Sequence, residues 1–241
     1  MNSLLKRKIE FFARELVFRL DTTKYLFDKP IFDYQPLPWI GIMDAPVRGQ
    51  ATYERWEGIK KSIPSEAFSL KDIGCCVGFF CHKATEELNL LSLGIDSDDR
   101  FIRIARYTAA KNVKLKGEAF LELQLNPQNV SIIPTTDITI LFSIWHHWVF
   151  DYGLENATKM LKEIWLKTNM TLYFESGEEE IELEFNFDFK GNAKLWLKTY
   201  LQTELENSSI EIVGEYEAGK YEHYKIKSHL RTVYAIKKIM A

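Results

Sequence analysis

Cysteine is scarce in this chain of 241 residues, and its three copies are crowded together. Cys75, Cys76 and Cys81 lie within seven positions, and adjacent cysteines rarely bridge because disulfide geometry resists it. A structural zinc site usually needs two separated pairs of thiolates, and the sequence has no second cluster. We therefore interpret the cysteines as small buried hydrophobes, and we expect a cytoplasmic protein without a bound metal.

Excess positive charge is missing as well. Lysine and arginine together number 31, against 34 aspartates and glutamates, which gives a net charge of -3. Such a chain offers no broad attraction to phosphate backbones, so a nucleic-acid partner is not expected.

Long hydrophobic runs are also lacking, and the sequence predicts no transmembrane segment. Residues 1–20 come nearest, but charged side chains such as Glu10, Arg14 and Arg19 interrupt every stretch. Apolar residues recur in this segment at helical spacing, which predicts an amphipathic helix. We expect its apolar face to pack on the rest of the protein. The alternative is contact with a membrane surface, because basic residues 6–8 lie near phenylalanines.

What the sequence does contain is a regular alternation of short apolar runs and longer amphipathic runs. Short apolar runs are typical of buried strands, and helical spacing of apolar residues is typical of surface helices. The expected strands are 67–74, 90–96, 118–125, 137–144, 170–176, 210–217 and 231–239, and the expected helices are 51–63, 79–89, 99–112, 154–168 and 193–205. The alternation predicts an α/β fold with a mostly parallel sheet and helices on both faces.

Ligands of an open parallel sheet bind at the carboxyl ends of the strands. This rule directs attention to the loops after Gly74, Asp96 and Ile144. The first loop, LKDIGCCVGFFCHKA, places Asp72 two positions before Gly74 and Gly78 four positions after it. A glycine lets the backbone pass close beneath a ligand, and the helix that follows directs free N–H groups at it. The loop therefore predicts a cradle for a nucleotide-type cofactor.

Two other nucleotide-binding motifs fit this loop poorly. The dinucleotide fingerprint G-x-G-x-x-G needs two more glycines, at positions where this chain has Cys76 and Phe79. A phosphate-binding loop needs a lysine followed by serine or threonine, and the stretch contains no such pair. A nicotinamide-dependent oxidoreductase, which would share the fold, is therefore disfavoured.

The loop instead resembles the first motif of the class I S-adenosyl-L-methionine-dependent methyltransferases, which carry Asp-x-Gly-x-x-x-Gly at the end of the first strand. The resemblance extends to Asp96 after the next strand, to TDITILFSIWHHWV around the fourth strand, and to the closing strand pair. It implies a Rossmann-like sheet of seven strands, mostly parallel with the last strand antiparallel, in residues 61–241. Residues 1–60 would then form an N-terminal helical extension or cap.

The same resemblance implies S-adenosyl-L-methionine as the cofactor and assigns residues to it. The loop would cradle the cofactor with Asp72, Gly74, Cys75 and Gly78, and Asp96 would accept hydrogen bonds from both ribose hydroxyls. Position 76 departs from the family, because many members have glycine where this chain has cysteine.

The stretch YERWEGI, ahead of the first strand, resembles a subset of these enzymes that includes polysaccharide-modifying and wobble-uridine-modifying members. That resemblance implies that Tyr53 or Arg55 meets the methionine carboxylate of the cofactor. A guanidinium suits this role because it binds a carboxylate through two parallel hydrogen bonds. The alternative is a surface arginine beside a core tryptophan.

Two adjacent histidines, His146 and His147, follow the fourth predicted strand. Methyl transfer to a hydroxyl requires removal of a proton, and histidine accepts protons near neutral pH. Neighbouring side chains diverge, so at most one of the pair faces the reacting carbon. We predict His147 as the base, with His146 as the second choice, and Asp151 as the residue that holds the ring of His147. The alternative is that both histidines belong to the pocket wall.

Aromatic and acidic residues near these loops are candidates for acceptor binding. Trp145 and Trp148 would shape an aromatic pocket, although core packing is the alternative for at least one of them. Glu175 would bind a hydroxyl or an amine, or else cap a helix. The predicted function is methylation of a hydroxyl on a small molecule or glycan. Methylation of RNA such as tRNA, and cofactor binding without catalysis, remain open, as does the oligomeric state.

Overall fold

The computed structural model describes residues 12, 13, 16, 35–43, 51–177, 188–189, 191–218 and 229–239. The predicted amphipathic helix over residues 1–20 lies outside this part except for Phe12, Ala13 and Leu16, which are helical and exposed. Most of the extension predicted over residues 1–60 also lies outside it, so the packing and the membrane contact predicted for residues 1–20 stay predictions. In the described part of the chain, no helix is long and apolar enough to cross a membrane.

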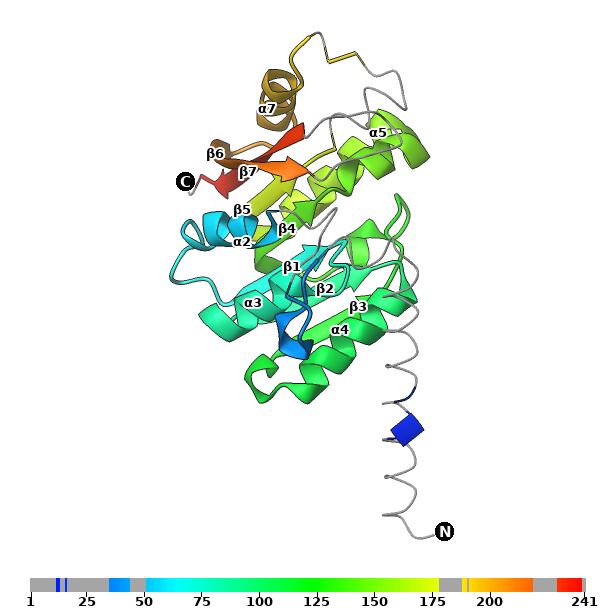
Figure 1. The fold of residues 1–241 in the computed structure, drawn as a ribbon. Coiled ribbons are helices and arrows are strands. Elements are labelled where there is room, and N and C mark those ends of the chain that lie inside the picture. The colour runs from blue at the N-terminus through cyan, green and yellow to red at the C-terminus, as the bar shows by residue number, and fades with distance from the viewer. Residues whose placement is uncertain are drawn as a thin grey trace.

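A seven-stranded sheet forms the middle of the protein (Figure 1), in the order β3-β2-β1-β4-β5-β7-β6. The first five strands in this order, from β3 through β2, β1 and β4 to β5, pair in parallel. Strand β7 is antiparallel to both β5 and β6. The strands are β1 (Ser69–Ile73), β2 (Leu91–Asp96), β3 (Glu118–Glu122), β4 (Thr136–Phe142), β5 (Thr168–Glu175), β6 (Ser208–Ala218) and β7 (His229–Lys238). This confirms the predicted mostly parallel sheet with an antiparallel last strand.

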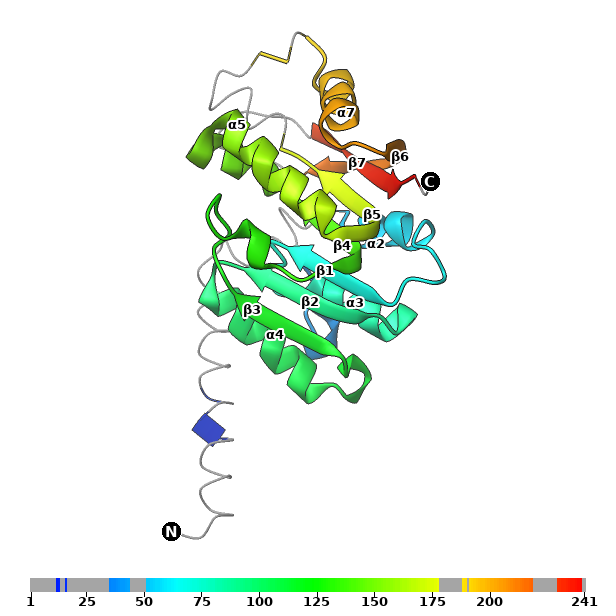
Figure 2. The same ribbon diagram turned by 180° about the vertical axis from the view of Figure 1, so that it is seen from behind.

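Helices cover both faces of the sheet (Figures 1 and 2), with α2, α3 and α4 on one face and α5 and α7 on the other. The α-helices are α2 (Thr52–Lys60), α3 (Phe79–Leu88), α4 (Asp99–Lys111), α5 (Trp145–Leu166) and α7 (Ala193–Glu204). Three short 3-10 helices join them, namely η1 (Pro38–Ile40), η2 (Val113–Leu115) and η3 (Val130–Ile132). Each of the five helices predicted between residues 51 and 205 has a counterpart among these elements.

The start of α5 differs from the prediction. We expected a helix over 154–168, but α5 begins at Trp145 and is interrupted at Gly153, whose φ of 79° and ψ of 158° are non-helical. The predicted strand before it ends at Phe142, because Ser143 turns the chain with a φ of +55°. Gly153 therefore separates two helical pieces, and the first piece carries the histidine pair.

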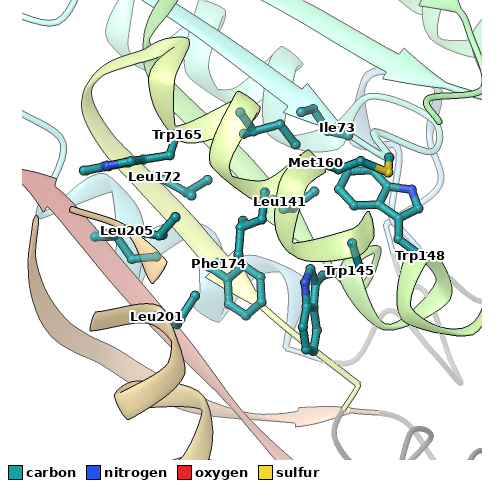
Figure 3. Packing of buried hydrophobic residues seen from close by; sticks show 14 of the residues in the cluster. Ile73, Leu141, Trp145, Trp148, Met160, Trp165, Leu172, Phe174, Leu201 and Leu205 are labelled. Atoms are coloured by element: carbon teal, nitrogen blue, oxygen red, sulfur yellow. The ribbon is translucent and has the colours of Figure 1, made fainter. Parts of the chain in front are cut away.

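The core fills both faces of the sheet. Figure 3 shows Trp145 of α5, Phe174 of β5 and Leu201 of α7 packed together on one face. On the other face, Trp56 of α2 belongs to the same buried cluster as Phe79 of α3. Since both faces are covered, ligand sites are expected at the carboxyl edge, where the strand order reverses between β1 and β4.

Candidate functional site

A pocket of about 260 Å³ opens at this carboxyl edge, beside the start of α5. Its lining comes from the ends of β1 and β2, the loop after β3, and the first turns of α5. The lining residues are Ile73, Gly74, Ile95, Asp96, Ser97, Leu123, Gln124, Leu125, Ile144, His147, Trp148, Asp151 and Tyr152. The pocket thus lies where open parallel sheets bind their ligands.

The loop after β1 forms the floor of the pocket through Gly74. This glycine has a φ of +77°, and a Cβ atom there would lie 2.3 Å from the side chain of Ile144. Glycine is therefore required both by the backbone conformation and by the close approach of the next loop. Cys76, where a glycine is common in the resembling family, also has a positive φ, of +51°. The loop therefore carries some backbone strain at Cys76, which unlike glycine has a side chain.

Asp96 lines the pocket and also ties two loops together. Its Oδ2 atom accepts a hydrogen bond from the backbone N–H of Cys76 at 2.8 Å, and its Oδ1 atom accepts one from Asp98 at 2.9 Å. Burial raises the pKa of Asp96, and these two backbone donors oppose the rise. The backbone N–H of Ser97 also bonds to this carboxylate. Since a carboxylate has about four lone-pair sites, it keeps some capacity to accept a hydrogen bond from a ligand.

Three other predicted cofactor residues lie behind the pocket and not on its surface. Asp72 is buried, and its Oδ2 atom accepts no hydrogen bond from the described residues. Burial, reinforced by the charge of Asp96, raises the pKa of Asp72 to about 8. Cys75 is buried, and its thiol donates to the carbonyl of Cys76. Gly78 is the N-cap residue of α3. These residues shape the loop from behind, and their direct contact with a cofactor stays a prediction.

The two histidines have different surroundings, although their ring centroids lie only 4.2 Å apart. His147 is exposed and lines the pocket, as do Trp148 and Asp151 on the same helical piece. His146 is only 1% exposed, and its Nδ1 atom accepts a hydrogen bond from the backbone N–H of Gly177 at 3.0 Å. The geometry therefore supports the predicted division, in which one histidine faces the ligand site and the other bonds to the backbone.

Trp145, predicted to contact the acceptor, has a fully buried side chain that packs in the core. Its ring lies against Phe174 and Tyr200. The sequence suggested core packing as the alternative for one tryptophan of this pair, and the structure places Trp145 there. Trp148, also predicted to contact the acceptor, does line the pocket.

Arg55 and Glu175, predicted to bind the cofactor and the acceptor, form an ion pair with each other. The Nε atom of Arg55 donates to Oε2 of Glu175 at 2.6 Å, and both side chains are at least nine-tenths buried. Ser143 donates its hydroxyl to Oε1 of Glu175 at 2.9 Å and accepts a hydrogen bond from Nη1 of Arg231, also at 2.9 Å. Tyr53 packs edge-on against Phe79. This buried network borders the end of β4, outside the pocket lining.

Several site residues escaped the sequence reasoning. Gln124 and its two leucine neighbours follow β3, and the rule about carboxyl ends of strands would have indicated them. Ser143 and Arg231 could not be identified in this way. No local sequence pattern predicts that Ser143 has a positive φ, or that Arg231 joins the hydrogen-bond network around Glu175. Within the described ranges, no three histidine, cysteine, aspartate or glutamate side chains come together as metal ligands.

The lining has a distinct electrostatic character. It contains two carboxylates, from Asp96 and Asp151, and neither lysine nor arginine. A site of this kind attracts positive charge and disfavours phosphate groups. Leu123 and Leu125 add apolar walls on either side of the amide of Gln124. The pocket suits a ligand that combines an apolar ring, hydroxyl groups and a positive charge.

Solved structures of methyltransferases are similar to this chain in fold. They include WbdD, a bifunctional kinase-methyltransferase, with a TM-score of 0.56, 17% identity and coverage of 90% of this chain and 46% of that chain. They also include the magnesium protoporphyrin IX methyltransferase ChlM from Synechocystis PCC 6803 with bound SAM, with a TM-score of 0.55, 12% identity and coverage of 78% of each chain. EvdMO1 matches with a TM-score of 0.54, 11% identity and coverage of 77% of this chain and 40% of that chain.

This chain spans less than half the length of the WbdD chain. No protein-family model and no curated protein matches the sequence. The structural likeness confirms that the chain has the Rossmann-like fold of class I methyltransferases, which the first loop and the strand series predicted.

Proposed function

We propose that this protein binds S-adenosyl-L-methionine in the pocket and transfers the methyl group to a hydroxyl of a small molecule or glycan. One observation carries the proposal: Gly74, Asp96 and His147 line the same pocket, at the point where the strand order reverses. The likeness in fold to a methyltransferase crystallised with bound SAM supports it. The free cysteines in the described part of the chain fit a cytoplasmic location, where thiols stay reduced.

The residues present fit this cofactor on three counts. Asp96 offers its remaining acceptor capacity to a ribose hydroxyl, since the backbone N–H groups of Cys76, Ser97 and Asp98 use only part of the about four lone-pair sites of its carboxylate. Leu123 and Leu125 provide apolar walls for an adenine ring. The carboxylates of Asp96 and Asp151 complement a positive sulfonium, which is the group that supplies the transferable methyl. The same lining disfavours a dinucleotide, because no cation in it would face the pyrophosphate.

The chain's own contribution to the chemistry is to position the acceptor and to take its proton. His147 is exposed at the pocket, so its imidazole can accept a proton from an acceptor hydroxyl and release it afterwards. Asp151 lies one helical turn further along and lines the same pocket, where its charge stabilises the imidazolium. Trp148 and Ile144 exclude water from this corner of the site.

Titration calorimetry with S-adenosyl-L-methionine, its demethylated product and NAD tests the cofactor assignment. We expect binding of the first two ligands and none of NAD. Absence of binding by either sulfur compound would refute the proposed function, and binding of NAD alone would favour the oxidoreductase.

Replacement of the histidines then tests the base. We expect His147→Ala to keep cofactor affinity and to lose turnover by about 100-fold or more. The matched variant His146→Asn keeps an acceptor for the Gly177 N–H and should retain most of the activity. Equal turnover of His147→Ala and the wild type would exclude His147 as the base.

Acceptor screens with hydroxylated small molecules, glycans and tRNA complete the test. We expect hydroxyl acceptors from the first two groups, because the net charge of -3 does not favour RNA. Methylation of tRNA would favour the RNA-modifying alternative. A protein that binds the cofactor but methylates none of these acceptors would favour the binding module without catalysis.

A further inference from the structure

Residues 35–43, which we call the strap, form a small closed loop ahead of the sheet. The backbone N–H of Leu37 donates to the carbonyl of Ile42 at 2.7 Å, and the N–H of Ile42 donates back to Leu37 at 3.0 Å. Between them run the 3-10 helix η1 and Gly41, whose φ of +86° lets the chain reverse. The strap is thus held in shape by its own backbone, and it acts on its neighbours as one preformed unit.

The strap supplies the missing cap of α3. The N-cap residue of this helix is Gly78, which has no side chain to accept the free N–H groups of the first turn. Gln35 fills this role from a distance of 44 residues, since its Oε1 atom accepts a hydrogen bond from the N–H of Phe79 at 3.1 Å. Gln35 is only 8% exposed, so its amide is directed into the protein and not to solvent.

Two further contacts fix the strap against the cofactor loop and α3. Leu37 is fully buried and belongs to one apolar cluster with Cys76 and Val77 of the loop after β1. Trp39 donates its indole N–H to Glu86 at 3.0 Å, and its ring lies 4.8 Å from that of His82. The strap therefore contacts the loop and α3 without lining the pocket.

This external support matters because the loop is strained. Gly74, Cys76 and Gly78 all have positive φ angles, and Cys76 pays for its value because it has a side chain. Strained backbone persists only where the surrounding structure holds it. The N–H of Cys76 bonds to Asp96, so a loop that relaxes would also release the carboxylate assigned to the ribose.

We infer that Gln35 is a positioning residue for cofactor binding, which acts through the first turn of α3 and the strained loop on Asp96. The inference rests on the proposed function, because it concerns the site assigned there to S-adenosyl-L-methionine. Gln35 does not line the pocket. It sets the affinity for the cofactor and leaves the chemical step unchanged.

Substitutions of equal length at position 35 test this role. Gln35→Met keeps the length of the side chain but loses the acceptor, whereas Gln35→Glu keeps an acceptor and adds a negative charge favourable at a helix N-terminus. The control is Gln202→Met, at an exposed position of α7 far from the loop. Calorimetry with the demethylated cofactor gives Kd, steady-state kinetics give kcat at saturating cofactor, and hydrogen exchange reports the Phe79 amide.

We expect Gln35→Met to raise Kd about fivefold to tenfold, in the usual range of coupling between sites, with kcat unchanged. Its Phe79 amide should exchange faster, and Gln35→Glu should restore both values. An unchanged Kd in Gln35→Met, beside wild-type protein that binds normally, would overturn the inference but leave the proposed function intact. An equal loss in Gln35→Met and Gln35→Glu would overturn it too, since packing alone would explain that result. Wild-type protein that binds no cofactor would refute the proposed function, and the inference with it, whatever the Phe79 amide does.

Discussion

Replacing Lys71 with methionine should make the protein more stable at neutral pH and remove part of its pH dependence. Lys71 lies in β1 and is fully buried. Its ammonium group donates to the hydroxyl of Thr136 at 3.1 Å and to the carbonyl of Lys167, the C-cap residue of α5, at 2.6 Å. Both acceptors are neutral, and burial, reinforced by the charge of Lys167, lowers the pKa of Lys71 to about 7.

The magnitude follows from the difference between the folded and unfolded states. A lysine whose pKa falls from its ordinary 10.5 to about 7 binds its proton less well in the folded protein. The free energy of unfolding therefore rises with pH between these values, and the full cost of about 5 kcal/mol is present below pH 7. Between pH 7 and pH 9 alone, the expected rise is about 2 kcal/mol.

Methionine preserves most of the side-chain volume and leaves the former partners satisfied. The Lys167 carbonyl still accepts the N–H of Thr136 at 3.1 Å, and the Thr136 hydroxyl still donates to Ile138. Removal of a buried charge without orphaned partners is neutral or stabilising by about 1–4 kcal/mol.

Urea unfolding of the wild type and Lys71→Met at pH 7, 8 and 9 measures the effect, with exposed Lys116→Met as the control. We expect the wild type and the control to gain about 2 kcal/mol more than Lys71→Met between pH 7 and pH 9. Parallel pH profiles for all three proteins would refute the reasoning.

Three further predictions concern the loops and the buried charges. Asp72→Asn should be more stable than the wild type at pH 8, because folding raises the pKa of Asp72 to about 8. The contribution of Asp72 to wild-type stability therefore falls by about 1.4 kcal/mol per pH unit as pH rises from 4 to 8. Gly74→Ala should cost about 2–5 kcal/mol, from its positive φ and the overlap with Ile144. Gly153→Ala, with no atom near its Cβ, should cost only about 1–3 kcal/mol. Arg55→Met should cost about 3–5 kcal/mol, because it leaves a buried carboxylate without its guanidinium.

Denaturant unfolding checks all three, and each has an outcome that contradicts it. A stability difference between Asp72→Asn and the wild type that is the same at pH 5 and pH 8 would show that Asp72 does not titrate in this range. Equal losses in the two glycine variants would remove the argument from the contact with Ile144. For Arg55, a double-mutant cycle with Glu175→Gln that gives no coupling energy would mean that the pair does not stabilise the fold.

Much of the fold follows from local pattern. The strands and helices alternate with clear periods, and their order together with the rule for parallel sheets placed Gly74, Asp96 and His147 at one edge. The start of α5 was missed because the aromatic residues before Gly153 show no clean helical period. A glycine is also typical both of a loop before a helix and of a break within one, so Gly153 did not distinguish the two.

The contacts that complete the site could not be predicted in this way. Glu175 and Arg55 are separated by 120 positions, and Gln35 and Phe79 by 44, so no local spacing relates them. Each residue type had several plausible partners, and only the packing of α2 and the strap on the sheet selects among them. The contact of Arg55 with Glu175 therefore had no signal in the sequence, and its predicted contact with the cofactor stays a prediction.

His146 and His147 are adjacent and of the same type, but the hydrogen bond between His146 and Gly177 should make them differ in the substitutions that they tolerate. A Cβ atom at position 177 would lie 2.8 Å from the imidazole of His146, so these two positions constrain each other. We expect position 146 to accept any replacement that can receive an amide hydrogen bond, whatever its basicity. If His147 is the base, as proposed, position 147 should accept only a replacement that can take a proton. Saturation mutagenesis of both positions, selected for activity, should therefore give two different sets of tolerated residues. If the same library is selected only for folding, position 146 should keep its restriction, whereas position 147 should lose its own.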